Sequence, residues 1–222
     1  MNRMPEKFNV LRRIYEEVIM AILRFDKLED TSRMADAMID GGIGVLEISL
    51  TTPGALRSIE QLVTKWNEKI LTGAGTVLDA TSARMAIEAG SRFIVCPTLS
   101  REVIMMCNRY GVAVIPGIGS VTELVQAMEW GADVVKIFPG SLFGPGFVRA
   151  LEGPLPQARV IPVGGVGNDN LQTWLDAGAF SLGLGKGLTH PDGLVANPVA
   201  AGKRAIEICG LVNQERLRRQ KQ

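Results

Sequence analysis

Short apolar runs alternate with amphipathic segments along most of the chain. Residues 18–23 and 45–50 are rich in β-branched and aliphatic side chains, which is typical of strands buried on both faces of a parallel sheet. Between such runs, segments with helical spacing end in glycine, a common helix terminator. Further strands are predicted to begin near Ile70, Arg92, Val112, Val134, Arg159 and Ser181. The pattern therefore predicts eight βα units.

The two ends of the chain are predicted to be helical. Phe8, Leu11 and Ile14 lie at helical spacing, so a short amphipathic helix is expected before the first strand. A last helix is expected over residues 198–211, followed by a frayed polar tail over 216–222. One domain, residues 1–222, is therefore expected, with an N-terminal helix (1–17), a barrel (18–190) and a C-terminal helix and tail (197–222).

Eight βα units in a chain of 222 residues favour an α/β fold, a closed (β/α)8 TIM barrel with an additional N-terminal helix. A doubly wound open sheet is the alternative. Such a sheet usually carries Gly-x-Gly-x-x-Gly after its first strand, and that motif is missing here.

Composition narrows the class of protein further. With 46% hydrophobic residues and a net charge of +1, the chain can bury a large core, and neither nucleic acid nor an anionic membrane is expected as a partner. No apolar run reaches the length of a membrane span. Three scattered cysteines and a single histidine, His190, indicate a cytoplasmic protein without disulfides, metal or cofactor. His190 lies in a polar stretch and is expected to be solvated.

Two charges interrupt the apolar runs. Lys136 stands within the sixth predicted strand and Glu47 within the second. Alternation along a strand points both into the barrel, and Arg24 and Thr76 end the first and third strands near its C-terminal mouth. A lysine that reaches out to solvent from the strand end is the structural alternative. Because barrels of this type keep their chemistry at that mouth, the four residues predict a site.

Two glycine clusters follow the seventh and eighth predicted strands. Gly164 and Gly165 end the seventh, and Gly185 with Lys186 ends the eighth. Backbone N–H groups in these loops form a recurring phosphate site in barrels. Tight turns alone would explain one cluster, but two clusters and a lysine favour phosphate.

A buried lysine and a nearby carboxyl group suit a particular reaction. Burial disfavours the charged form of a lysine, so the neutral amine of Lys136 can attack a ketone and form a Schiff base. The iminium then accepts the electrons of a breaking C–C bond, while Glu47 removes the proton from the departing hydroxyl. The residues therefore predict a metal-free retro-aldol enzyme, a lyase, acting on a phosphorylated keto acid.

The chain resembles, over almost its whole length, the class I aldolases that cleave 2-keto-3-deoxy-6-phosphogluconate (KDPG). The family includes bifunctional enzymes that also cleave 4-hydroxy-2-oxoglutarate (KHG), and a branch specific for the galactonate epimer. The matching segments are Ala21-Ile22-Leu23-Arg24, Leu46-Glu47-Ile48, Gly73-Ala74-Gly75-Thr76-Val77, Ile115-Pro116-Gly117, Lys136-Ile137-Phe138-Pro139 and Val163-Gly164-Gly165-Val166.

The resemblance implies roles for these residues. Lys136 would form the Schiff base and Glu47 would shuttle protons. Residues assigned to the substrate carboxylate or the pyruvate pocket are Arg24, Thr76, Pro97, Phe138 and Thr51, and those assigned to the phosphate are Gly164, Gly165, Gly185 and Lys186. The implied products are pyruvate and D-glyceraldehyde 3-phosphate, as in the Entner–Doudoroff pathway, or pyruvate and glyoxylate from KHG. A homotrimer is also implied.

The sequence leaves the C4 epimer of the substrate open. Thr51 stands where many gluconate-branch enzymes have arginine, and Val163 matches the galactonate branch, so a 2-dehydro-3-deoxy-6-phosphogalactonate aldolase is the alternative. Two alternatives of another class are a phosphosugar isomerase or epimerase and a barrel that binds a phosphorylated metabolite without turnover.

Overall fold

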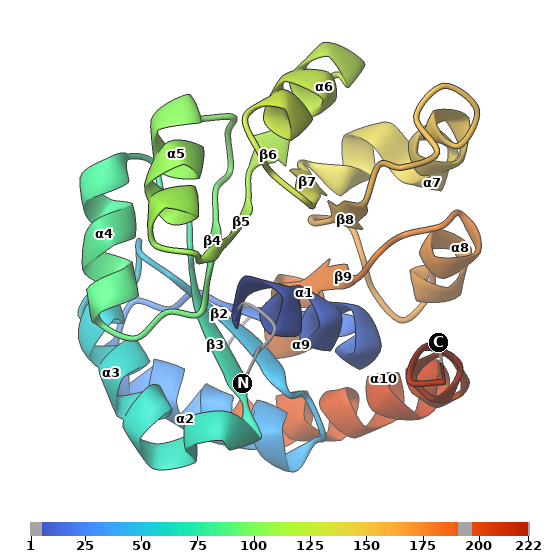
Figure 1. Cartoon of the computed structure of the whole chain (residues 1–222). Coiled ribbons are helices and arrows are strands. Elements are labelled where there is room, and N and C mark those ends of the chain that lie inside the picture. The colour runs from blue at the N-terminus through green and yellow to red at the C-terminus, as the bar shows by residue number, and fades with distance from the viewer. Residues whose placement is uncertain (1–5, 191–196, 222) are drawn as a thin grey trace.

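Parallel strands form the centre of the molecule and helices surround them (Figure 1). The computed structural model describes residues 6–190 and 197–221. The strands are β1 (Ile19–Leu23), β2 (Val45–Ser49), β3 (Leu71–Gly75), β4 (Phe93–Val95), β5 (Ala113–Ile115), β6 (Gly117–Ile118), β7 (Val135–Ile137), β8 (Val160–Pro162) and β9 (Leu182–Leu184). The helices are α1 (Glu6–Glu17), α2 (Leu28–Asp40), α3 (Ala55–Trp66), the 3-10 turn η1 (Asn67–Lys69), α4 (Ala80–Glu88), α5 (Arg101–Arg109), α6 (Val121–Glu129), α7 (Gly140–Leu151), α8 (Leu171–Asp176), α9 (Lys186–Thr189) and α10 (Pro198–Arg219).

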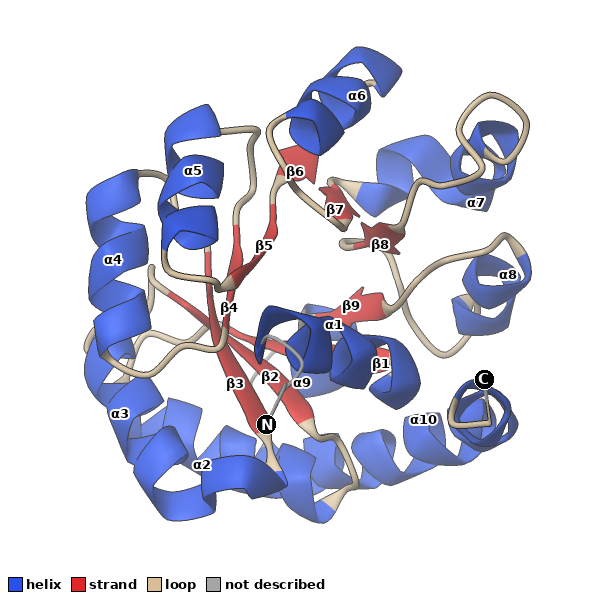
Figure 2. Cartoon of the chain, viewed as in Figure 1, coloured by secondary structure: helices blue, strands red, loops and turns tan. Residues whose placement is uncertain are grey.

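The strands pair in parallel throughout the described residues. One sheet has the order β5-β4-β3-β2-β1-β9 and a second has the order β6-β7-β8. Figure 2 shows the strands inside the ring of helices that connect them. The predicted α/β class with parallel strands is therefore confirmed. The fifth predicted strand differs from expectation, because Pro116 divides it into β5 and β6; a proline has no N–H to give to a strand ladder.

Side chains along each strand alternate between two separate hydrophobic clusters. In β1, Ile19 and Ala21 belong to the cluster packed under the helices, whereas Met20 and Ile22 belong to an inner cluster. Val134, just before β7, also belongs to the inner cluster. The predicted alternation therefore holds, and Lys136, two residues after Val134, has the parity of the inner face.

Helix α1 covers the end of the strands opposite Arg24 and Thr76. Its apolar stripe, Val10, Leu11 and Ile14, is buried in the inner cluster, and Figure 1 shows the helix crossing the centre of the strands. This amphipathic helix thus closes the N-terminal end of the strands, which leaves their C-terminal end for chemistry.

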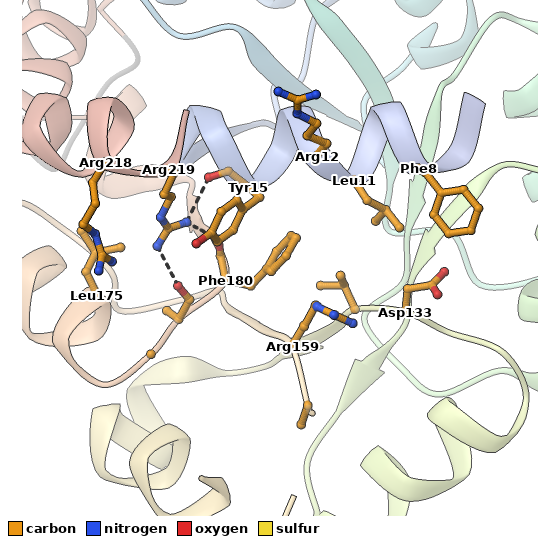
Figure 3. A pocket seen from close by; sticks show the side chains of 14 residues that line it. Phe8, Leu11, Arg12, Tyr15, Asp133, Arg159, Leu175, Phe180, Arg218 and Arg219 are labelled. Carbon is orange, nitrogen blue, oxygen red and sulfur yellow. Dashed lines mark hydrogen bonds between the residues drawn. The ribbon is translucent and has the colours of Figure 1, made fainter. Parts of the chain in front are cut away.

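Helix α10 is longer than the sequence predicts. It continues to Arg219, a residue that is only 5% exposed. The Arg219 guanidinium donates hydrogen bonds to the backbone carbonyls of Tyr15, Ala179 and Phe180 (Figure 3). Because Arg219 satisfies these carbonyls, the last turns are docked, and the expected frayed tail is wrong for the described residues 216–219.

Candidate active site

Lys136 lies in the middle of β7 with its side chain almost entirely buried. It is 4% exposed, and its backbone lies opposite Gly117 of β6 and Ile161 of β8. Nζ is 4.9 Å from the centre of the Phe138 ring. Both side chains line a cavity of about 340 Å³ at the C-terminal end of the strands. The lysine that interrupts an apolar strand therefore reaches the wall of a cavity rather than bulk solvent.

Glu47 of β2 is fully buried, and neither carboxyl oxygen has a hydrogen-bond partner among the described residues. Burial raises the pKa of Glu47, while the positive charges of Lys136 and Arg24 oppose that rise. The carboxyl group lies directly over Gly75 of β3, where an added Cβ would come within 1.8 Å of Oε1. The absence of a side chain at Gly75 thus leaves space for the Glu47 carboxyl group. Because its pKa is raised, this group can keep a proton at a pH at which an exposed glutamate is ionised.

Arg24 is held at the end of β1 by hydroxyl groups from two neighbouring strands. Its Nε donates to Ser49 Oγ at 3.2 Å and its Nη2 donates to Thr76 Oγ1 at 3.1 Å. The Ser49 and Thr76 hydroxyls are 2.9 Å apart, and Thr51 Oγ1 is 2.8 Å from Ser49 Oγ. Arg24 also lines the cavity. The network therefore orients a guanidinium group toward the space beside Lys136.

Thr51 and Pro97, both predicted to contact the substrate, lie outside the lining of the cavity. Thr51 is exposed and reaches the network only through Ser49. Pro97 is half-buried after β4, and a Cβ added to Gly117 of β6 would meet its backbone at 2.3 Å. Neither residue is among those that line the cavity. Their predicted contact with a substrate is therefore not evident from the cavity, in contrast to Arg24, Lys136 and Phe138.

The glycine clusters meet at the other side of the same cavity. Gly164, Gly165, Gly185 and Lys186 all line it. Gly164 and Gly165 have φ values of 86° and 77°, a region that favours glycine. A Cβ on Gly165 would also lie 2.6 Å from Ser141 Cβ in α7. These loops therefore bring backbone groups and one lysine close to the space that Lys136 faces.

Sequence reasoning assigned no site role to three residues, one beside the cavity and two in its wall. Ser49 makes hydrogen-bond contacts with Arg24, Thr76 and Thr51. It lies two residues after Glu47 in β2 and so points to the same face of the sheet, which is the sequence signal that could have identified it. Thr189 and His190, at the end of α9, line the cavity. His190 is half-buried rather than fully solvated as expected, and its ring stacks on Phe25 with the ring centroids 6.2 Å apart.

A second cavity, of about 620 Å³, lies at the opposite end of the strands beneath α1. Figure 3 shows its wall, with Tyr15 and Phe180 close together and Arg159 reaching in from the segment before β8. It contains none of the predicted site residues. No group of three or more histidine, cysteine, aspartate or glutamate side chains suited to a metal ion occurs within residues 6–190 and 197–221.

Comparison with known proteins identifies the family. The family model of the KDPG and KHG aldolases matches residues 10–201 of the chain. The chain belongs to this family. It is 40% identical to 2-dehydro-3-deoxy-6-phosphogalactonate aldolase of Escherichia coli K12 over 171 residues, which cover 77% of this chain and 83% of that protein. It is 35% identical to 2-dehydro-3-deoxy-phosphogluconate aldolase of Treponema pallidum, over 76% of this chain and 79% of that protein.

A solved structure shows relevant chemistry in a relative. KDPG aldolase of Legionella pneumophila, captured with pyruvate as a covalent carbinolamine intermediate, superposes with a TM-score of 0.80 and 26% identity, over 94% of this chain and 99% of that one. As a member of the KDPG and KHG aldolase family, the chain is a class I aldolase, a lyase that cleaves a carbon–carbon bond. Among its described helices, none combines the length and apolar character needed to cross a membrane.

Proposed function

We propose that this aldolase cleaves a phosphorylated 2-keto-3-deoxy sugar acid into pyruvate and D-glyceraldehyde 3-phosphate through a Schiff base on Lys136. The observation that carries the proposal is the pairing of a buried lysine at the cavity wall with a fully buried carboxyl group, Glu47, that interacts with it electrostatically. No hydrogen bond or ion pair among the described residues occupies Nζ, so the amine is available to a substrate.

The reaction follows from these two groups. Nζ of Lys136 attacks the C2 carbonyl carbon, and loss of water gives the iminium. Glu47 removes the proton of the C4 hydroxyl, the C3–C4 bond breaks, and the bonding electrons move into an enamine. The aldehyde leaves, C3 is protonated, and water releases pyruvate and the free lysine. Phe138, 4.9 Å from Nζ, supplies an apolar wall for the methyl end of pyruvate.

Each end of the substrate has a charged partner in this proposal. The guanidinium of Arg24, oriented by Ser49 and Thr76, binds the C1 carboxylate. The phosphate binds at Gly164, Gly165, Gly185 and Lys186. Support comes from the N–H of Gly165, which has no acceptor among the described residues, and from the exposed ammonium group of Lys186. Thr51 contributes through its 2.8 Å contact with Ser49, and Pro97 through its packing against Gly117.

The galactonate epimer is the better supported substrate. The 40% identity to a 6-phosphogalactonate aldolase exceeds the 35% identity to a 6-phosphogluconate enzyme, and Val163 and Thr51 depart from the gluconate branch. The gluconate epimer is the second candidate, because both branches share one family model, and KHG is a third substrate to test. Pyruvate release measured side by side on the three compounds distinguishes them.

We also infer that the two sheets form one closed (β/α)8 barrel, with α1 as an addition, in a single domain of residues 1–222. Only Pro116 separates β5 from β6, and a parallel bridge between Val163 and Gly183 joins β8 to β9.

A homotrimer is proposed from the resemblance, and light scattering on the purified protein tests it. A cytoplasmic location is proposed because Cys96, Cys107 and Cys209 are all free thiols.

Borohydride reduction in the presence of pyruvate tests the Schiff base. A covalent adduct on Lys136, located by peptide mass spectrometry, is the expected result. Lys136→Met should abolish both the adduct and pyruvate release, whereas Glu47→Gln should slow release and still permit trapping. A protein that cannot be trapped under conditions that trap a known class I aldolase would rule out this mechanism. It would favour an isomerase, an epimerase or a binding protein instead.

A further inference from the structure

The single histidine of the chain lies at the phosphate end of the cavity. His190 follows α9 directly, and its backbone N–H donates to the carbonyl of Lys186 at 2.8 Å. Both side chains line the cavity that also contains Gly165 and Lys136. This placement makes the imidazole a potential ligand rather than a solvated loop residue.

Two contacts fix the orientation of the His190 ring. It stacks on the buried ring of Phe25 with an interplanar angle of 17°. Its Nδ1 is 2.8 Å from Thr189 Oγ1, and in the tautomer that carries the proton on Nε2 the Thr189 hydroxyl donates to Nδ1. Nδ1 is thereby occupied. Nε2 has no partner among the described residues, so it is the ring nitrogen left for a ligand in the cavity.

The charges around this cavity select an anion. The ionisable residues that line it are Arg24, Lys136, Lys186 and His190, and no aspartate or glutamate is among the described lining residues. Arg24 lies at the end of β1 with its hydroxyl partners, and Lys136 lies within β7. Lys186 and His190 are therefore the two ionisable lining side chains of α9 and its C-terminus that can donate to an anionic group.

We propose that His190 binds the phosphoryl group of the substrate through Nε2, together with Lys186, and that Thr189 positions the ring for this contact. The proposal rests on the proposed function, since it assigns the phosphoryl group to one end of the cavity. His190 thereby favours phosphorylated over unphosphorylated keto acids. It takes no part in forming the Schiff base.

Kinetics on paired substrates test this assignment. His190→Phe keeps a ring to stack on Phe25 but removes both nitrogens, and His190→Gln retains a donor near the position of Nε2. We expect His190→Phe to lower kcat/KM for the phosphorylated substrate by about ten- to a hundredfold, the usual value of a charge-assisted hydrogen bond, mainly through KM. KHG cleavage and pyruvate trapping on Lys136 should change by less than about twofold, and His190→Gln should restore part of the loss. An equal loss on both substrates, or none on either, would overturn the proposal.

Thr189 offers a matched pair of variants for the positioning role. Thr189→Val keeps the shape of the buried side chain without its hydroxyl, and Thr189→Ser keeps the hydroxyl. Thr189→Val should raise KM for the phosphorylated substrate while leaving kcat unchanged, and Thr189→Ser should resemble the wild type. If the two variants behave alike, Thr189 has no positioning role.

A spectroscopic measurement on the wild type is independent of any folding defect. Because the chain has one histidine, its imidazole gives a single pair of ring resonances that inorganic phosphate should shift in a saturable way. Phosphate that inhibits cleavage competitively without moving those resonances would refute the contact. Failure of the proposed function is distinguishable, because wild-type protein would then show neither trapping nor cleavage.

Discussion

Replacement of Gly75 by alanine would test whether the position of the Glu47 carboxyl group controls catalysis. An added Cβ would lie 1.8 Å from Oε1, 2.3 Å from Cδ and 2.5 Å from Cγ of Glu47. Gly75 cannot move away easily, because it pairs with Ser49 in β2 and its carbonyl accepts the N–H of Leu50 at 2.8 Å. The backbone therefore stays in place, and the Glu47 side chain has to move.

The expected losses of stability and of kcat follow from this steric overlap. Nonbonded carbon and oxygen atoms rarely approach within about 3 Å, so the 1.8 Å contact requires Oε1 to retreat by more than about 1 Å. Overpacking of this kind costs about 1–3 kcal/mol of folding free energy. A misplacement of about 1 Å lowers the rate of a catalysed step by about a hundredfold. Gly75→Ala should therefore fold, lose about 5 °C of Tm, and lose about two orders of magnitude in kcat.

Three measurements together check this expectation. Thermal unfolding gives the stability cost, a coupled assay of pyruvate release gives kcat, and borohydride trapping reports the Schiff base. Trapping should persist, because Lys136 lies on another strand. Gly210→Ala is the matched control: Gly210 is exposed in α10, and an added Cβ meets nothing within 4 Å. That substitution should leave activity unchanged and stabilise the helix by up to about 1 kcal/mol.

A double-mutant cycle identifies the clash itself. In a Glu47→Ala background the colliding atoms are gone, so Gly75→Ala should cost much less stability there than in the wild type. The expected coupling is about 1–3 kcal/mol. If Gly75→Ala costs the same in both backgrounds, or leaves kcat unchanged in the wild type, the argument from the Glu47–Gly75 contact is refuted.

Two further predictions concern stability and thiol reactivity. Arg219→Met should lower the free energy of unfolding by about 3 kcal/mol in a urea titration, because it strands three backbone carbonyls, whereas Arg218→Met, exposed on the same turn, should cost less than about 1 kcal/mol. Equal costs would refute the docking role of Arg219. Burial raises the pKa of Cys96 to about 12, so a thiol reagent at pH 8 should modify the partly exposed Cys209 first and leave Cys96 unmodified in the native protein. Early labelling of Cys96 in mass spectra would contradict its burial.

The strand pattern could be predicted from the sequence because burial on both faces leaves an unbroken apolar run. The same pattern identifies Glu47 and Lys136 as candidate site residues, because a charged side chain within such a buried run is shielded from solvent. The parity of alternate residues then placed both on the inner face. These predictions needed only local information: the position of a residue within its own strand.

Other features depend on contacts between distant segments. The role of Ser49 arises because Arg24 and Thr76 approach it from neighbouring strands. Arg219 is ordered by carbonyls about 40 and 200 residues away in sequence, and the polar tail considered alone is therefore predicted to fray. The placement of His190 likewise depends on its stacking against Phe25, which belongs to the other end of the chain. Contacts of this kind between distant segments leave no periodic pattern in the sequence.

The charge of the Glu47 carboxyl group and the covalent state of Lys136 are coupled during the proposed reaction. A buried ion pair loses the hydration of both groups, which favours a proton on the buried Glu47 carboxyl group before the substrate binds. Burial is the main reason that the pKa of Glu47 is raised, which is consistent with that arrangement. Glu47 can give its proton to the carbinolamine hydroxyl, which leaves as water; the positive charge of the iminium then favours the ionised carboxylate, and that carboxylate accepts the proton of the C4 hydroxyl. The covalent step thus converts the carboxyl group from an acid into a base, and an exposed glutamate, ionised throughout, could not follow the same cycle.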